Sequence, residues 1–338
     1  MNEAPPLLRL FDALTERDAL ALAKSTVIGA QHIGSGNAMR LPGIPVQTLA
    51  MPVLYPETQT LYDIWMTREP CRASQIGDIA ICSTDEMLFG TIAIDDSALR
   101  ESDKTSTLRT ASERAYREIF QLLDRQNYPH LWRVWNYIPD IHGEEAGLER
   151  YRQFNIGRHD AFAAAQRTVD SSPAASALGT QSGLLSIAFI AGRREPVRIE
   201  NPRQISAYTY PSQYGPSSPT FSRAVTVAEG CERILFISGT ASIVGHTTMH
   251  TGDAVAQTLE TVANLSALLQ QTNTANCALS LIDLAYRIYI RHARDLTPVR
   301  QALEKAIGGS PHAVYVQADI CRTDLLVEIE AFAVMPGQ

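Results

Sequence analysis

Two glutamates near the end of the chain, Glu328 and Glu330, have the spacing that most clearly suggests chemistry. They lie in the segment "CRTDLLVEIEAFAV", residues 321–334, which is typical of a β-strand. Side chains alternate along a strand, so both glutamates should lie on one face, with apolar side chains on the other. That pattern allows two interpretations: a half-buried strand with a solvated face, or a strand that carries an acid.

Under the second interpretation, the apolar surroundings of the strand would keep one glutamate protonated, so that it could act as a proton donor. Burial disfavours the charged form of a carboxyl group, and a like charge at Glu330 would raise the pKa of Glu328 further. A raised pKa keeps a proton available near neutral pH, which is what general acid catalysis requires.

The other chemistry-bearing residue types show no cofactor motif. The five cysteines are dispersed: Cys71, Cys82, Cys231, Cys277 and Cys321. They form no CxxC pair and no Cys/His cluster at zinc spacing, so reduced thiols are expected, most of them small and buried. The glycine-rich stretch 29–43 matches neither GxGxxG nor GxxxxGK[ST], and is expected to be a loop. An enzyme with this sequence should therefore work without a nucleotide, a metal or a covalent serine.

Bulk composition excludes several classes of protein. The chain has 338 residues, of which 45% are hydrophobic, so it can form two domains with real cores. A net charge of -7 and the absence of a dense Lys/Arg cluster argue against nucleic acid and anionic membranes as partners. The first residues contain no apolar segment of signal-peptide or transmembrane length, so a cytoplasmic protein is expected.

An internal repeat indicates the architecture that must position these side chains. In the second half, strand and helix patterns alternate over the ranges 233–243, 254–272, 284–292, 296–309, 313–321 and 325–334. The first half has the same order over 86–95, 108–126, 131–140, 147–165 and 183–192. Aligning "LSIAFIA" with "VEIEAFA" pairs Glu328 with Ser186 and Glu330 with Ala188, so only the second copy carries the carboxylates.

The economical interpretation is an α+β protein with two tandem modules, each a mixed sheet with helices on one face. We expect an N-terminal extension over 1–60, a first module over 61–205 and a second module over 206–338 that carries the acid. The Pro/Ser-rich segment 208–223 would connect the modules.

The second module resembles the RidA/YjgF family over most of residues 206–335. The resemblance rests on "SGTASIVG", "GDAVAQTLETVANLSALL" and "LLVEIEAFAV". It implies a chorismate-mutase-like sheet with ligand clefts between neighbouring modules, on the face that the helices leave open. One feature departs from RidA imine deaminases: Ala313 stands where that family has an arginine, so this chain lacks the carboxylate anchor that a deaminase of that family would need.

The whole chain is more similar to the chorismatase family, which joins two such modules and cleaves chorismate. The similarity is strongest from Val134 to Phe162, in "SGTASIVGH" (238–246) and in "CRTDLLVEIEAFAV". It implies a cofactor-free enzyme with chorismate as its small-molecule substrate.

Chorismate carries two carboxylates and an acid-labile enol ether, so its site needs cationic groups, apolar walls and a proton donor. Arginine binds carboxylates through two parallel hydrogen bonds. Arg158 and Arg223 are the favoured anchors because they fall in family-like segments, with Arg152 as a further candidate. Each could equally be a solvated surface charge. Candidates for the walls are the tyrosines Tyr151, Tyr208, Tyr210 and Tyr214, which could instead be packing residues.

The resemblance identifies Glu328, rather than Glu330, as the acid that protonates the enol ether. It also associates a cysteine at the position of Cys321 with the branch that forms 3-hydroxybenzoate and pyruvate, although Cys321 could also be a plain buried thiol. Small residues around Gly239 and Ala241 would line the cleft and control the room for water. Hydrolysis to a dihydroxycyclohexadiene carboxylate plus pyruvate, and a mixed 3-/4-hydroxybenzoate product, remain alternatives.

A function of another class also stays open: a RidA-like protein that binds a small acid without turning it over. Glu328 discriminates between the two, because a binding protein needs no protonated acid beside its ligand. The sequence leaves the oligomeric state open, with a homo-oligomer among the alternatives.

Overall fold

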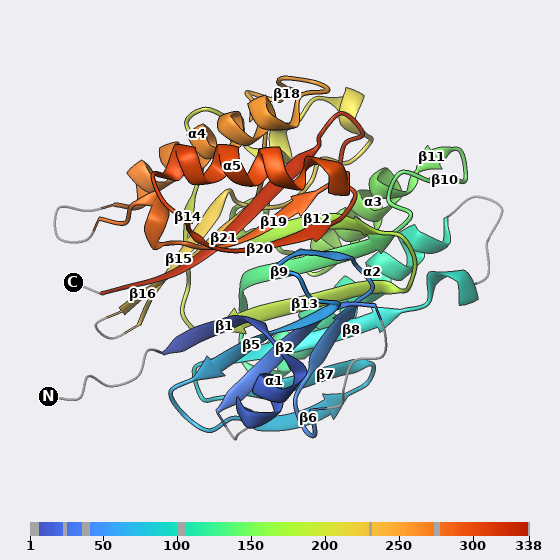
Figure 1. The fold of residues 1–338 in the computed structure, drawn as a ribbon. Helices are drawn as coiled ribbons and strands as arrows, with labels where there is room; N and C mark the ends of the chain where they lie inside the picture. Colours follow the sequence, from blue (N-terminus) through green and yellow to red (C-terminus); the bar gives the residue numbers. More distant parts are fainter. Residues whose placement is uncertain are drawn as a thin grey trace, which may run out of the picture.

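The computed structural model describes residues 7–22, 26–35, 41–99, 106–229, 232–273 and 278–336. Three principal sheets make up this part of the chain (Figure 1). Two belong to the expected modules, and the third is formed near the N-terminus. Among the described residues no helix is both long and apolar enough to cross a membrane.

The first module has a six-stranded sheet in the order β12-β9-β13-β8-β7-β6. Its strands are β6 (Arg72–Ile76), β7 (Ile79–Ser83), β8 (Met87–Ile94), β9 (His130–Pro139), β12 (Ala174–Thr180) and β13 (Leu185–Gly192). The helices α2 (Thr107–Gln126) and α3 (Arg150–Ala164) pack on one face of it. A short hairpin of β10 (Glu144–Glu145) and β11 (Leu148–Glu149) precedes α3.

The second module repeats this order strand for strand, as β20-β19-β21-β16-β15-β14, with β4 added beside β20. The strands are β4 (Val53–Tyr55), β14 (Val197–Ile199), β15 (Ala224–Glu229), β16 (Glu232–Ala241), β19 (Ala285–Ile290), β20 (His312–Gln317) and β21 (Val327–Pro336). Helices α4 (Ala254–Thr272) and α5 (Leu296–Ile307) cover one face (Figure 1). A hairpin of β17 (Ile243–Val244) and β18 (Thr247–Thr248) follows β16. The predicted fold class and duplicated order are confirmed.

The N-terminal segment forms a sheet of its own, in the order β1-β5-β2-β3. It comprises β1 (Leu8–Leu14), β2 (Val27–Gly34), β3 (Val46–Leu49) and β5 (Thr60–Thr67), with α1 (Glu16–Leu22) between β1 and β2. Its pairings match four consecutive strands of each module, β12-β9-β13-β8 and β20-β19-β21-β16: β3 runs parallel to β2, and β5 runs antiparallel to β2 and β1. This sheet extends to Thr67, past the expected boundary at residue 60, and β14 joins the second sheet although it precedes residue 206.

Local sequence explains where the helices begin and end. Ser106 and Asp253 cap α2 and α4 by accepting hydrogen bonds from backbone N–H groups of the first turn. Helix α5 ends at Gly308, which adopts the left-handed conformation that glycine tolerates best. A Cβ at Gly157 would collide with the backbone of α2 at Arg109, so glycine at this position allows α2 and α3 to pack closely.

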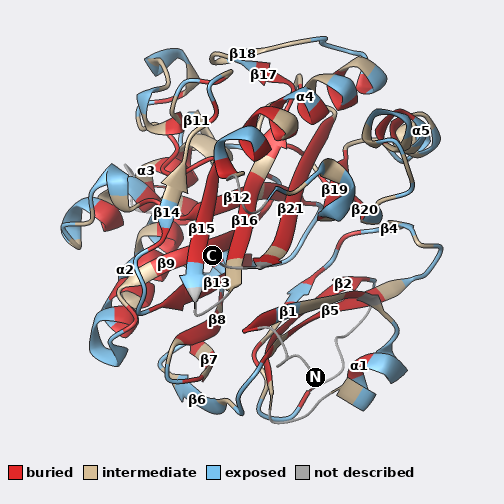
Figure 2. Ribbon diagram, turned by 90° about the vertical axis from the view of Figure 1, so that its left-hand side faces the viewer, coloured by how far each residue is buried: buried red, intermediate tan, exposed pale blue. Residues whose placement is uncertain are grey.

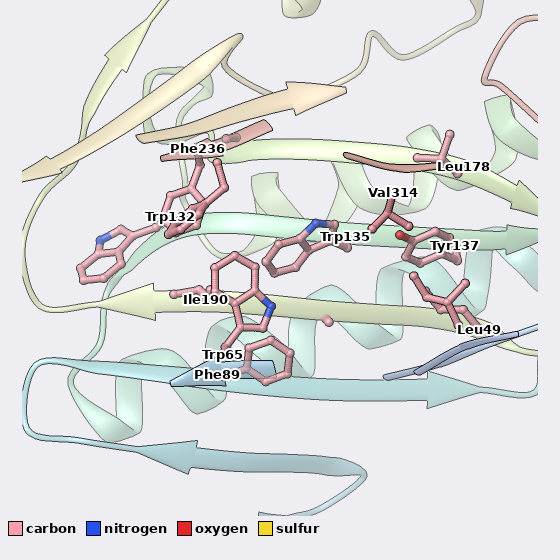
Figure 3. Packing of buried hydrophobic residues seen from close by; sticks show 14 of the residues in the cluster. Leu49, Trp65, Phe89, Trp132, Trp135, Tyr137, Leu178, Ile190, Phe236 and Val314 are labelled. Atoms are coloured by element: carbon pink, nitrogen blue, oxygen red, sulfur yellow. The ribbon is translucent and has the colours of Figure 1, made fainter. Parts of the chain in front are cut away.

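The helix-free faces of the three sheets meet in one apolar core. Trp65 of β5, Trp135 of β9 and Phe332 of β21 each come from a different sheet, and the ring centroid of Trp65 lies 5.5 Å from that of Trp135 and 5.0 Å from that of Phe332. Figure 3 shows Trp65 and Trp135 among the other large side chains of this core. The strands are accordingly buried along most of their length, whereas the helices expose their outer faces (Figure 2). Burying each such side chain stabilises the fold by about 2 kcal/mol.

Two cysteines that are dispersed in sequence come together in the fold. Cys71 and Cys82 are free thiols whose Sγ atoms lie 2.7 Å apart; Cys71 directly precedes β6, and Cys82 lies in β7. Cys321 is the third free thiol of the described residues. Cys231 and Cys277 lie outside the described residues.

Candidate active site

A cleft of about 450 Å³ lies between the two modules, and we call it the inter-module cleft. It is lined by the start of α3, the segment 210–223 that precedes β15, the end of β16, the start of β21, and the loop between β20 and β21. Behind it, β12 of the first module lies beside β16 of the second (Figure 2). Ser238 joins these strands, because its hydroxyl accepts a hydrogen bond from Ala175 N at 2.9 Å and donates to Ser222 O at 2.5 Å.

Most of the residues predicted from sequence meet in this cleft. Those that line it are Tyr151, Arg152, Tyr214, Arg223, Gly239, Ala241, Cys321 and Glu328. Arg158 lines a smaller adjoining cavity, which shares Glu328, Cys321 and Gly239 with the cleft. Tyr208 lines neither cavity, because it lies in a 3-10 turn, Ala207–Thr209, that directs Tyr210 into the cleft instead.

Sequence reasoning missed several lining residues, of which Arg322 is the most important for chemistry. Its guanidinium lies over the rings of Tyr214 at 3.9 Å and Tyr210 at 5.2 Å. It directly follows Cys321 in the loop between β20 and β21. Its place next to a predicted site residue is the one feature of the sequence that could have identified it. Phe221 and Pro219, in the connecting segment, add apolar walls.

Glu328 is buried, with 4% of its surface exposed, and lies on the helix-free face of β21 as the alternation predicted. In the described part of the chain its carboxyl group has no hydrogen-bond partner among the side-chain contacts. Burial, together with the negative charge of Glu330, raises the pKa of Glu328 to about 8, against a smaller opposing effect of Arg133. Glu328 is therefore largely protonated at neutral pH.

Gly239 and Ala241 make room for that carboxyl group. Ala241 is the cross-strand neighbour of Glu328, in β16. A Cβ at Gly239 would overlap Glu328 Oε1. Any larger residue at position 239 would therefore push the carboxyl group out of its place.

Cys321 and Tyr151 line both cavities together with Glu328. Burial, with a contribution from the charge of Glu328, raises the pKa of the Cys321 thiol to about 12, so it remains a neutral thiol at physiological pH. Burial also raises the pKa of Tyr151, and the presence of Cys321 adds to that effect. Both groups can donate a hydrogen bond but carry no charge.

Three arginines around the two cavities have buried N–H groups without a hydrogen-bond partner in the described structure. These are Arg158 at Nε and Nη2, Arg223 at Nε and Arg322 at Nη2. Unbonded guanidinium donors are costly to bury, so their presence beside a cavity indicates that an anion completes them. Arg152, in contrast, forms an ion pair with Glu149, with 3.2 Å between Arg152 Nε and Glu149 Oε2.

Close packing holds two of these arginines in place. The guanidinium of Arg158 lies 5.0 Å from the ring centroid of Tyr116 and 5.4 Å from that of Phe162. Arg223 Nη2 donates to Ile205 O and to the Tyr210 hydroxyl, both at 2.8 Å. Side chains fixed in this way lose little entropy when an anion binds.

The arrangement thus brings together a neutral carboxylic acid, a neutral thiol, aromatic walls and several guanidinium groups. It can bind a small molecule with more than one carboxylate and protonate it. Among the described residues, no group of three or more His, Cys, Asp or Glu side chains is arranged to hold a metal ion.

Comparisons with known proteins agree with this chemistry. Residues 63–191 match the family described as "Chorismatase FkbO/Hyg5-like, N-terminal", and residues 215–335 match the family described as "Endoribonuclease L-PSP". The chain is 33% identical to a 3-hydroxybenzoate synthase of Streptomyces hygroscopicus, covering 83% of this chain and 84% of that protein. It is 32% identical to a chorismatase of Streptomyces rapamycinicus, with 88% of each covered.

A solved structure is similar over nearly the whole chain. The crystal structure of a chorismatase superimposes with a TM-score of 0.85 and 30% sequence identity, covering 96% of this chain and 98% of that one. The likeness therefore includes the N-terminal sheet as well as the two modules.

Proposed function

The chain belongs to the chorismatase family, and from that premise we propose that it converts chorismate to 3-hydroxybenzoate and pyruvate, with Glu328 as the general acid. The observation that carries the proposal is the surroundings of Glu328. A buried carboxyl group with a pKa of about 8 stands in a cleft whose arginines have unbonded donors. A proton donor and anion-binding groups are the two features that cleavage of a dicarboxylate enol ether requires.

In the proposed reaction Glu328 protonates the methylene carbon of the enolpyruvyl group. The positive charge that develops on the ether carbon is stabilised by its oxygen and by the adjacent carboxylate. The neighbouring ring hydroxyl then attacks the ring carbon that bears the ether, the bond from that carbon to the ether oxygen breaks, and pyruvate leaves. The hydroxyl proton returns to Glu328, and the ring rearranges to the aromatic product. The products together contain the atoms of chorismate, without added water.

Arg158, Arg223 and Arg322 are proposed to bind the two carboxylates. Their donors surround the cavities that contain Glu328, and the tyrosines beneath Arg322 would support the ring. The inter-module cleft has a volume in the range typical of small-molecule sites.

The proposal of 3-hydroxybenzoate as the product depends on Cys321. The identities to the 3-hydroxybenzoate synthase and to the chorismatase, 33% and 32%, do not separate the branches. A neutral thiol beside Glu328 occupies space that a hydrolytic water would need, which favours attack by the ring hydroxyl. Hydrolysis to the diol, or a mixture of 3- and 4-hydroxybenzoate, is the alternative outcome.

The test is to incubate the purified protein with chorismate alone and to quantify pyruvate and ring products by chromatography with mass detection. We expect pyruvate and 3-hydroxybenzoate in equal amounts. The matched variant Glu328→Gln should bind chorismate with nearly unchanged affinity and lose about 10²–10⁴-fold in turnover. Full activity of this variant would reject Glu328 as the acid, and intact chorismate with the native protein would favour a binding protein without turnover.

A further inference from the structure

Four charged side chains lie buried where the three sheets meet, close to Glu328. They are Asp63 of β5, Arg133 of β9, Arg287 of β19 and Glu330 of β21, and we call them the charge cluster. Their side chains are between 2% and 9% exposed. The charge cluster thus contains one residue from the N-terminal sheet, one from the first module and two from the second.

Glu330 is the member nearest to Glu328 in the sheet, and it is held by four groups. Arg133 Nη2 and the Ser176 hydroxyl both donate to Glu330 Oε2 at 2.6 Å, and Trp135 Nε1 donates to Oε1 at 3.0 Å. Arg287 Nη1 lies 3.6 Å from Oε1. Burial opposes ionisation, but the two arginines and the hydrogen bonds hold the pKa of Glu330 below its usual range. Glu330 therefore keeps its negative charge.

Arg287 is shared between two carboxylates from different sheets. Its Nη2 pairs closely with Asp63 Oδ2, and Gln31 Oε1 accepts from the same nitrogen at 3.0 Å. The contact with Asp63 is shorter than the contact with Glu330, so Asp63 draws Arg287 toward the N-terminal sheet. Two carboxylates and two guanidinium groups make the charge cluster neutral as a whole. Asp12 lines the same small cavity as the charge cluster and has a counter-group of its own, because its Oδ1 lies 2.8 Å from His312 Nε2.

We propose that the charge cluster is a positioning device for the acid: Glu330 maintains a fixed negative charge beside Glu328, and Asp63 balances Arg287 so that no net positive charge faces Glu328. This inference rests on the proposed role of Glu328. It gives the N-terminal sheet, which contributes no residue to the inter-module cleft, a part in the reaction.

The direction of each substitution follows from charge. Asp63→Asn or Glu330→Gln leaves the charge cluster with a net positive charge, which favours ionised Glu328 and lowers its pKa. Arg133→Gln leaves a net negative charge and raises that pKa. A purely structural role would not produce shifts of opposite sign.

Other charged groups also face Glu328, and they stay constant across these variants. Around the cavities the cations are Arg152, Arg158, Arg223 and Arg322, and the acids are Glu149 and Asp324. Cys321 and Tyr151 contact the same space, and Tyr289 pairs with Glu328 across β19 and β21. Tyr137 hydrogen-bonds Tyr289 at 2.8 Å, and burial raises the pKa of both. A difference in the pKa of Glu328 between variants therefore results from the change in the charge cluster.

The experiment is the pH profile of kcat/KM for pyruvate release. We expect the alkaline limb of Glu330→Gln to move down by about one pH unit, and that of Arg133→Gln to move up. The limb of Asp63→Asn should move down by less, because Asp63 acts through Arg287. The double variant Asp63→Asn/Arg287→Gln is neutral again and should return the limb to its native position. Asp96→Asn is the matched control, because it removes a buried carboxylate that pairs with Arg150 elsewhere, and its limb should not move.

Limbs that stay in place, or that all move in the same direction, would overturn the inference. If Asp63→Asn or Glu330→Gln does not fold, the opposite shifts of the other one and of Arg133→Gln decide the question. If Arg133→Gln does not fold, the return of the limb in the neutral double variant decides it. Failure of the proposed function is seen separately, because the native protein would then release no pyruvate or Glu328→Gln would retain turnover. Loss of turnover in Glu328→Gln with unmoved limbs in the charge-cluster variants would reject this inference alone.

Discussion

Glu328 and Glu330 project from the same face of β21, two residues apart, but their carboxyl groups have opposite surroundings. Glu330 accepts hydrogen bonds from Arg133, Ser176 and Trp135, whereas Glu328 faces the inter-module cleft. The pKa of Glu330 is lowered and that of Glu328 is raised. Paired carboxyl groups with diverging pKa values allow one to carry a proton while the other carries charge.

The first prediction concerns the pH dependence of the native protein. Turnover needs protonated Glu328, whose pKa is about 8. We therefore expect kcat/KM to be constant through neutral pH and to fall as the pH rises through about 8, approaching a tenfold loss per pH unit. Pyruvate release measured from about pH 6 to 9.5 checks this. A loss of activity already complete by neutral pH would contradict a protonated glutamate.

The second prediction concerns the stability of the fold, which the raised pKa of Glu328 makes dependent on pH. The pKa of Glu328 rises from 4.5 in the unfolded chain to about 8 in the fold, so the folded state binds its proton more tightly. This contribution to stability is full below about pH 4.5 and is lost as the pH rises toward 8, at about 1.4 kcal/mol per unit. Glutamine cannot ionise, so Glu328→Gln should be more stable than the native protein by about 2–4 kcal/mol near pH 8.

Urea unfolding at about pH 5 and about pH 8 measures that difference. The advantage of Glu328→Gln should be small at the lower pH and large at the higher one. Glu118→Gln, at a partly exposed position on α2, is a suitable control and should show no such growth. Equal stability of Glu328→Gln and the native protein at both pH values would show that ionisation of Glu328 does not destabilise the fold.

Regular alternation and periodicity explain which parts of the fold could be predicted. The faces of β21 follow from the period of two, and the helices α2 and α4 begin close to the positions that the apolar spacing indicated. The duplicated order followed from comparing the two halves. These features are patterns of the sequence itself, so a single chain reveals them.

Long-range pairing and irregular segments explain what was missed. Glu330 and Arg133 are 197 positions apart, and nothing in their local sequences indicates the ion pair. Arg322 lies in a loop, and the choice between Tyr208 and Tyr210 depends on a 3-10 turn, neither of which shows a period. The N-terminal sheet depends on the parallel pairing of β2 with β3, and such pairings are set by tertiary contacts.

The third prediction tests the anion-binding arginines. Arg158→Met, Arg223→Met and Arg322→Met should each raise KM for chorismate by about 10- to 100-fold, because a charge-assisted hydrogen bond is worth about 1.5–3 kcal/mol. The effect on kcat should be smaller. Arg152→Met is the comparison within the cleft, and its KM should change less because Arg152 is paired with Glu149. Steady-state kinetics with chorismate decide, and an unchanged KM would remove that arginine from the binding site.

The fourth prediction tests the space around the acid. In Gly239→Ala the new Cβ would overlap Glu328 Oε1, so the carboxyl group must move away from its position in the cleft. A displacement of this kind should lower kcat by about 100-fold. Gly309→Ala is the control: its Cβ would meet only the side chain of Ile282, and neither residue lines the cleft. Native turnover by Gly239→Ala would show that the position of the Glu328 carboxyl group is not critical.

The fifth prediction concerns the product. In Cys321→Ala the thiol beside Glu328 is removed, and the space it leaves is polar enough on the Glu328 side to admit a water molecule. Water would then compete with the ring hydroxyl, so the 3-hydroxybenzoate fraction should fall and the dihydroxycyclohexadiene carboxylate should rise, while pyruvate release continues. Cys82→Ala removes a buried thiol outside the cleft and should leave the product ratio unchanged. An unchanged ratio in Cys321→Ala would mean that the product is determined by other groups, such as the small residues at positions 239 and 241.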